Sequence, residues 1–110
     1  MIDKPHNDEE KLEEDIRYIN AEIIAKLKNG NYCKFSRALN AISILQITKE
    51  QYIKYWQMLY KNDELGFKLI LEACESKFND GLTSKKEMLE LLKNSNDIAD
   101  EREQLKLMLK

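Results

Sequence analysis

Histidine and cysteine, which commonly serve as catalytic residues and metal ligands, are few in this chain and far apart in the sequence. His6 is the single histidine, and the two cysteines, Cys33 and Cys74, form no CxxC pair. Structural zinc sites need clustered cysteine and histidine ligands, and a phosphate-binding loop needs several glycines in one turn, whereas the three glycines here are isolated. The sequence therefore predicts no metal site, no cofactor and no enzymatic activity.

The two cysteines have different expected roles. Cys74 falls on the apolar face of a predicted helix, which favours a small buried side chain. Cys33 stands near the start of another predicted helix, a position that can lower the pKa of a thiol. Because a nucleophilic cysteine also needs a base, and none is in view, an enzyme built on Cys33 ranks behind the other interpretations.

The most unusual segment is residues 48–63, TKEQYIKYWQMLYKND, in which lysines are mixed with large aromatic residues. Thr48 and Gln51 fit a capping box, which predicts a helix that begins at Thr48. On this helix the aromatic and aliphatic side chains share a sector of about 160°, wider than the roughly 100° that a core stripe needs, and most lysines lie opposite. Stacking of nucleic-acid bases needs both classes on one surface, so the pattern argues against a nucleic-acid-binding stripe.

Two interpretations of this wide sector stay open. In the first, Tyr52, Trp56 and Leu59 belong to the core and the other tyrosines only cover its edge. In the second, the margin is an exposed docking patch, because tyrosine tolerates partial burial and is enriched at protein interfaces. The candidate partner-binding residues are Tyr55, Met58, Tyr60, Lys54, Lys61, Glu13 and Glu14.

Charge is distributed unevenly along the chain. Residues 8–15, DEEKLEED, are strongly acidic, whereas residues 31–60 carry a net charge of +3 within a chain of net charge −2. The acidic run suits the positive end of a helix dipole and would also suit contact with a basic partner. An acidic chain is not drawn to nucleic acid or to an anionic membrane, so both are disfavoured as partners.

DNA binding nevertheless stays open as an alternative. Predicted helices over residues 33–46 and 48–62 have the proportions of a helix-turn-helix. The second of them would offer Lys49, Gln51 and Lys54 near its start, where a recognition helix contacts bases.

The elements that must position these residues are all predicted to be helices. Apolar residues recur at helical spacing, and one proline and three glycines leave little material for hairpins. The predicted helices cover residues 8–29, 33–46, 48–62, 64–78, 84–93 and 97–110, with the last two continuous unless residues 94–97 break them. The predicted fold is all-α, a single-domain irregular bundle of five helices, or six with that break. Residues 1–7 are predicted to be a flexible tail, residues 8–110 the helical bundle domain, and helix 33–46 its most buried part.

The C-terminal helix carries a stripe with few obvious partners inside such a bundle: Ile98, Leu105, Met108 and Leu109. This stripe suggests a homodimer contact through the C-terminal helix. The sequence shows no signal peptide and no apolar run long enough for a bilayer, which predicts a cytoplasmic protein with reduced thiols. The leading hypothesis is a small non-enzymatic protein-binding protein, a regulator, inhibitor or immunity-type factor that acts through a helical surface. The alternative is a helix-turn-helix DNA-binding transcriptional regulator.

Overall fold

The computed structural model describes residues 8–110, so the predicted N-terminal tail, with His6, lies outside the described residues. The described chain contains helices and a sheet. In chain order the elements are α1 (Asp8–Ala21), β1 (Ile23–Lys26), β2 (Tyr32–Ser36), β3 (Ala41–Ile47), α2 (Lys49–Leu59), α3 (Glu64–Asp80), α4 (Lys85–Lys93) and α5 (Ala99–Leu109). The three strands form an antiparallel sheet in the order β1-β2-β3.

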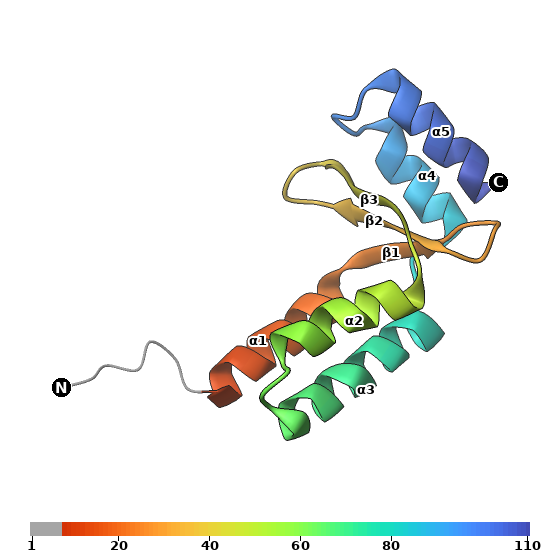
Figure 1. The fold of residues 1–110 in the computed structure, drawn as a ribbon. Coiled ribbons are helices and arrows are strands. Elements are labelled where there is room, and N and C mark those ends of the chain that lie inside the picture. Colours follow the sequence, from red (N-terminus) through yellow and green to blue (C-terminus); the bar gives the residue numbers. More distant parts are fainter. Residues whose placement is uncertain (1–7) are drawn as a thin grey trace.

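The sheet lies between two helical layers. Figure 1 shows α1, α2 and α3 on one side of the strands and α4 and α5 on the other. Successive side chains of a strand point to opposite faces: Ile24 packs with α1–α3, whereas its neighbours Ile23 and Ala25 pack with α4 and α5. Lys34 is paired with Ile24 across the sheet and therefore faces the α1–α3 side.

The prediction of an all-α bundle is wrong, because residues 23–47 form the sheet and the fold is mixed α/β. This segment is rich in isoleucine, whose branched side chain suits an extended backbone. Two turns complete the hairpins: Gly30 has a φ of 93°, a conformation that glycine adopts without strain, and Asn40 has a φ of 51°. Gly30 thus closes a hairpin, and the helix predicted over residues 8–29 ends at Ala21.

The helix predicted over residues 33–46 does not exist, and the helix-turn-helix alternative depended on it. In β2, Cys33 and Phe35 are buried while the residues between and beside them are partly exposed, which is the period-two pattern of a strand. At this position the described residues therefore contain a β-hairpin in place of the first helix of a helix-turn-helix.

Side chains cap the starts of α2, α3 and α4, and the cap predicted at Thr48 is confirmed. Thr48 and Gln51 form the complete capping box of α2, and Asp63 caps α3 by accepting from the amide of Gly66. Ser84 accepts from the amide of Glu87 at the start of α4. Each start is thus determined by a side chain within three residues of it.

Residues 94–97 do break the last helix, the outcome that gives two separate C-terminal helices. The carboxylate of Asp97 accepts a hydrogen bond from the Ile42 amide, and the amide of Asn96 donates to the Asn40 carbonyl at 2.7 Å. The residues of the break therefore form hydrogen bonds with the β2–β3 hairpin, which is far away in the sequence.

The C-terminal stripe has partners inside the chain. Leu105 and Leu109 are fully buried in a core between the sheet and α4–α5, and Met108 packs against this core. Ile98, by contrast, is exposed. A helical bundle offered no surface for this stripe, whereas the second face of the sheet provides one. The observation that suggested a homodimer through α5 is therefore accounted for within one molecule.

Candidate functional site

The largest cleft in the described structure opens between α1, the sheet and α2, with a volume of about 620 Å³. We call it the tyrosine cleft. Its lining residues are Lys11, Glu14, Asp15, Tyr18, Glu22, Lys34, Ile44, Ile47, Tyr52, Tyr55, Trp56 and Leu59. They come from α1, β2, β3 and α2, together with Glu22 just beyond α1, so only the folded chain creates this surface.

The inner end of the cleft holds a nearly buried polar network around Glu22, which lies between α1 and β1. The Glu22 carboxylate accepts a hydrogen bond from the Tyr52 hydroxyl and forms an ion pair with Lys34. Burial, and then the hydrogen bond to Glu22, raises the pKa of Tyr52 far above its ordinary value. The Tyr52 hydroxyl is therefore a hydrogen-bond donor at any physiological pH.

A buried lysine on α3 holds the same region in place through hydrogen bonds to its backbone. The Lys77 ammonium, on α3, donates to the backbone carbonyls of Asn20 at 2.8 Å and Glu22 at 2.7 Å. Burial lowers the pKa of Lys77. This contact satisfies carbonyls at the end of α1 that have no partner within the helix, and it holds the backbone of Glu22 in place.

Aromatic rings form the wall of the cleft. Trp56 is buried, and its ring meets those of Tyr18 and Tyr55 edge to face, with centroids 6.2 Å and 5.4 Å away. The two tyrosines are 56% and 58% exposed, and Leu59 beside them is 52% exposed. The indole nitrogen of Trp56 is buried, and no residue in the range 8–110 accepts a hydrogen bond from it. The wall therefore has a fixed base and an exposed apolar margin.

Cations already lie over some of these rings. The Lys34 ammonium is 5.8 Å from the centroids of both Tyr18 and Tyr52, within range of a cation–π contact. The ammonium of Lys11 is 5.8 Å from the Tyr60 ring. Each of these lysines also has a carboxylate partner.

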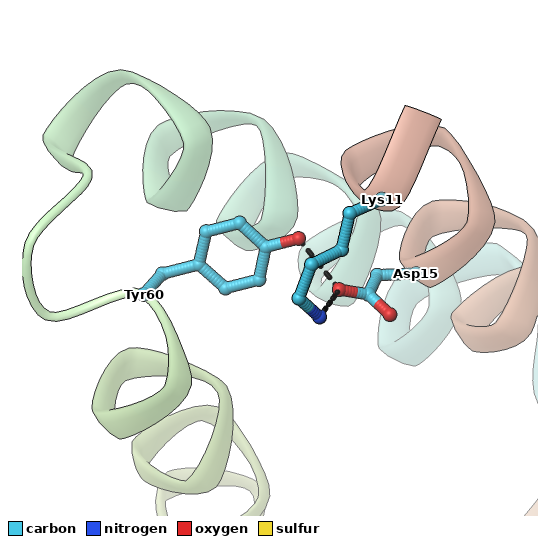
Figure 2. Close-up of polar contacts among 3 residues, drawn as sticks. All are labelled: Lys11, Asp15 and Tyr60. Carbon is cyan, nitrogen blue, oxygen red and sulfur yellow. Dashed lines mark hydrogen bonds and ion pairs between the residues drawn. The ribbon is translucent and has the colours of Figure 1, made fainter. Parts of the chain in front are cut away.

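The outer end of the cleft is tied together by Asp15. Its carboxylate accepts a hydrogen bond from the Tyr60 hydroxyl at 2.6 Å and pairs with the Lys11 ammonium at 3.1 Å (Figure 2). Tyr60 is only 7% exposed, so it belongs to the core, and the prediction that it stays partly exposed is wrong. The physical reason is its partner on α1, which lies far away in the sequence.

The structure separates the predicted partner-binding residues into two groups. Tyr55 and Glu14 line the tyrosine cleft. A second hollow, of about 420 Å³ between α2 and the start of α3, is lined by Lys54, Met58, Tyr60 and Lys61 together with Gln57, Glu64 and Phe67. Glu13 is exposed on α1 and lines neither. The predicted residues therefore do not all line one hollow.

Sequence reasoning missed several residues of the cleft. Leu59 was expected in the core and is half exposed, whereas Tyr52 and Trp56 are buried as expected. Glu22 and Lys34 were assigned to helices, so their ion pair could not be foreseen. The alternation of apolar Cys33 and Phe35 with polar Lys34 and Ser36 was the available sequence signal for Lys34.

Neither cysteine offers a reactive thiol. Both are fully buried. Burial raises the pKa of Cys33 to about 11 and that of Cys74 to about 12. The expected lowering of the Cys33 pKa is wrong, because Cys33 lies within a strand and away from any helix start. Cys74 is a buried side chain, as predicted.

The geometry of the tyrosine cleft suits reversible binding through aromatic surface and charge. Within residues 8–110, no three His, Cys, Asp or Glu side chains gather as a metal ion would require. None of the helices described here has the length and apolar character to cross a bilayer. Comparison with protein families, curated proteins and solved structures finds no match for this chain.

Proposed function

We propose that this chain is a small protein-binding protein and that the tyrosine cleft is its contact surface. The observation that carries the proposal is the exposed margin of Tyr18, Tyr55 and Leu59, three large side chains that are each more than half exposed around one cleft. Clustered exposed apolar side chains often mark interaction sites, and tyrosine is enriched among the residues that dominate binding energy. The proposed mode of action is occlusion of a surface of the partner.

The base of the cleft supports this proposal because it is held in place before a partner arrives. Trp56 is packed between the two tyrosines, and the Tyr52–Glu22–Lys34 network fixes α2 against the sheet. A surface that is already ordered loses little conformational entropy on binding. A partner would then gain the burial of the exposed margin at a low cost of rearrangement.

Site-specific photo-cross-linking tests the proposal. A photoreactive phenylalanine analogue at Tyr55 should capture a partner from the native cell extract, and the same analogue at Leu107 should not. Leu107 is the matched control because it is 66% exposed but lies on α5, on the far side of the sheet. Excess unlabelled wild-type protein should compete with the capture.

Alanine variants provide the quantitative arm of this test. Once the captured protein is purified, Tyr55→Ala and Leu59→Ala should each weaken its binding by about tenfold, as expected for central contact residues. Leu107→Ala should leave the affinity unchanged. Equal cross-linking from both positions, or unchanged affinity in Tyr55→Ala and Leu59→Ala, would remove the cleft from the binding surface.

A further inference from the structure

We infer that the tyrosine cleft receives an arginine side chain of the partner protein. This inference rests on the proposed function and adds the chemistry of the group that is bound. It follows from the charges that line the cleft and from the aromatic surface that they leave open.

The first observation is a carboxylate without a counter-ion. Of the charged residues that line the cleft, Lys34 is paired with Glu22 and Lys11 with Asp15. Glu14, which is exposed, has no ion pair within the part of the chain that the structure describes. The cleft therefore carries one uncompensated negative charge at its rim.

The second observation is an open aromatic face. The cation–π contacts among residues 8–110 use the rings of Tyr18, Tyr52 and Tyr60 but not that of Tyr55. Tyr55 is also the more exposed of the two tyrosines on the margin. The protein's own lysines thus show that this type of surface accepts a cation, and the Tyr55 ring, which lines the same cleft as Glu14, is left for a cation from outside.

The third observation is the field around the cleft. Helix α1, which forms one wall, contains six acidic and two basic residues. An acidic wall attracts a basic partner during association and disfavours an acidic one. The acidic α1 wall and Glu14 at the rim therefore favour the same sign of charge.

Arginine satisfies these three conditions together. Its planar guanidinium can stack on the Tyr55 ring and donate hydrogen bonds to the Glu14 carboxylate, and its aliphatic stem can cover Leu59. Lysine offers the charge and the stem but has no planar group to stack. We therefore expect arginine to bind more tightly than lysine at the same position.

Fluorescence of Trp56 gives a direct assay, because it is the single tryptophan of the chain and lies in the wall of the cleft. The probe is a short capped alanine–glycine peptide with one central arginine. The matched probes replace this arginine with lysine, with its uncharged analogue citrulline, or with glutamate. The arginine peptide should change the fluorescence saturably in the millimolar range, the lysine peptide should bind several-fold more weakly, and the other two should not saturate.

Two pairs of variants assign the response to particular residues. Glu14→Gln should weaken binding of the arginine peptide by about threefold at low salt, as for an exposed ion pair. Glu13→Gln, on the same acidic helix but outside the cleft lining, should have a clearly smaller effect. Tyr55→Leu keeps an apolar side chain but removes the π face, and it should weaken binding of the arginine peptide by about fivefold. Leu107→Ala is the control for a surface change elsewhere.

The outcomes separate this inference from the proposed function. If the citrulline peptide binds as tightly as the arginine peptide, or if the arginine peptide gives no saturable change, the inference is wrong. The proposed function still stands in that case if cross-linking and partner affinity depend on Tyr55 and Leu59. If the arginine peptide binds as expected but the purified partner is insensitive to both residues, the proposed function is wrong.

Discussion

The helical layers on the two sides of the sheet bury different kinds of side chain. On the α4–α5 side the core consists of Ile23, Ala25, Leu27, Cys33, Phe35, Met88, Leu92, Leu105 and Leu109. On the α1–α3 side the core contains four aromatic residues: Tyr52 and Trp56 of α2, Tyr60 at its C-cap, and Phe78 of α3. The charged groups of Glu22, Lys34 and Lys77 lie beside this core. The same sheet therefore supports one aliphatic core and one that combines aromatic rings with polar contacts.

This difference bears on which side can bind. Aliphatic packing is non-directional, so the α4–α5 side can close completely around its side chains. Buried charges need partners at defined positions, and the Glu22–Lys34 pair holds Tyr52 and the sheet in a geometry that leaves the tyrosine cleft open. The two sides should therefore respond to mutation by different physical mechanisms, the α4–α5 side through lost packing and the α1–α3 side through lost charge pairing.

The largest effect is expected in the aliphatic core. Leu105→Ala removes a fully buried side chain and should lower the free energy of unfolding by about 2–5 kcal/mol, through lost burial and the cavity left behind. Leu107→Ala, on the same helix but 66% exposed, should change it by less than about 0.5 kcal/mol. Urea denaturation measures both values, and similar losses in the two variants would show that Leu105 is not packed as described.

On the α1–α3 side, a similar loss of unfolding free energy should follow when one member of a buried ion pair is neutralised. Removing the other charge as well should partly reverse this loss. Glu22→Gln leaves the Lys34 ammonium without its carboxylate in a largely buried place and should cost about 3 kcal/mol in unfolding free energy. Adding Lys34→Met removes the orphaned charge and should restore part of this loss. Denaturation of both single variants and the double variant forms a complete cycle, and strictly additive losses would contradict a coupled pair.

The raised pKa values of the two buried thiols predict that the folded state loses stability at alkaline pH. Burial raises the pKa of Cys33 from 9.0 to about 11, so the folded state keeps a proton that the unfolded state has lost. The stabilisation is therefore complete below about pH 9 and is lost as the pH rises toward 11, by up to about 2–3 kcal/mol. Cys74, with a pKa of about 12, should act in the same direction and over a range that extends higher.

Variants separate this effect from the other groups that titrate at alkaline pH. Tyr52, whose pKa is raised, acts with the thiols, whereas Lys77, whose pKa is lowered, acts against them. Denaturation midpoints of the wild type and of Cys33→Ala over a pH series should converge above about pH 10, because only the wild type loses this term. If the midpoints of the two proteins instead run parallel over the pH series, the Cys33 thiol has the same pKa in the folded and unfolded states.

The smallest effect is expected at the contact between Tyr60 and Asp15. Tyr60→Phe removes the hydroxyl that donates to Asp15 and should cost about 1–2 kcal/mol in unfolding free energy, as for a hydrogen bond to a charged acceptor. The ring stays in the core, so the helix content measured by circular dichroism should not change. A loss as large as that of Leu105→Ala would mean that this hydroxyl, and not aromatic packing, holds α2 to α1.

Sequence reasoning was most successful where local chemistry decides the structure. The helix predicted over residues 64–78 is observed as Glu64–Asp80, and that over 84–93 as Lys85–Lys93. Both begin at side-chain caps that lie within three residues of the helix start. Of the two interpretations left open for α2, the docking-patch interpretation expected Tyr55 and Met58 to be exposed, and both are.

The same reasoning failed for residues 23–47 because strands are stabilised by partners at a distance in the sequence. A short run rich in isoleucine satisfies a helical stripe and a strand equally well, and the difference is decided by whether a neighbouring strand supplies hydrogen bonds. Ile23 finds such a neighbour at Phe35, and Tyr32 finds one at Ile47. Neither pairing leaves a local signal as strong as a helix cap.

The sequence by itself therefore determined the caps of α2, α3 and α4, the amphipathic character of α2, the burial of Cys74 and the acidic charge of α1. Each of these depends on neighbours within one or two turns of the chain. Only the tertiary structure decided that Tyr60 is anchored to Asp15, that Glu22 pairs with Lys34, and that α5 is covered by the sheet. The tyrosine cleft belongs to this second group, because its walls come from α1, the sheet and α2 and meet only when the chain is folded.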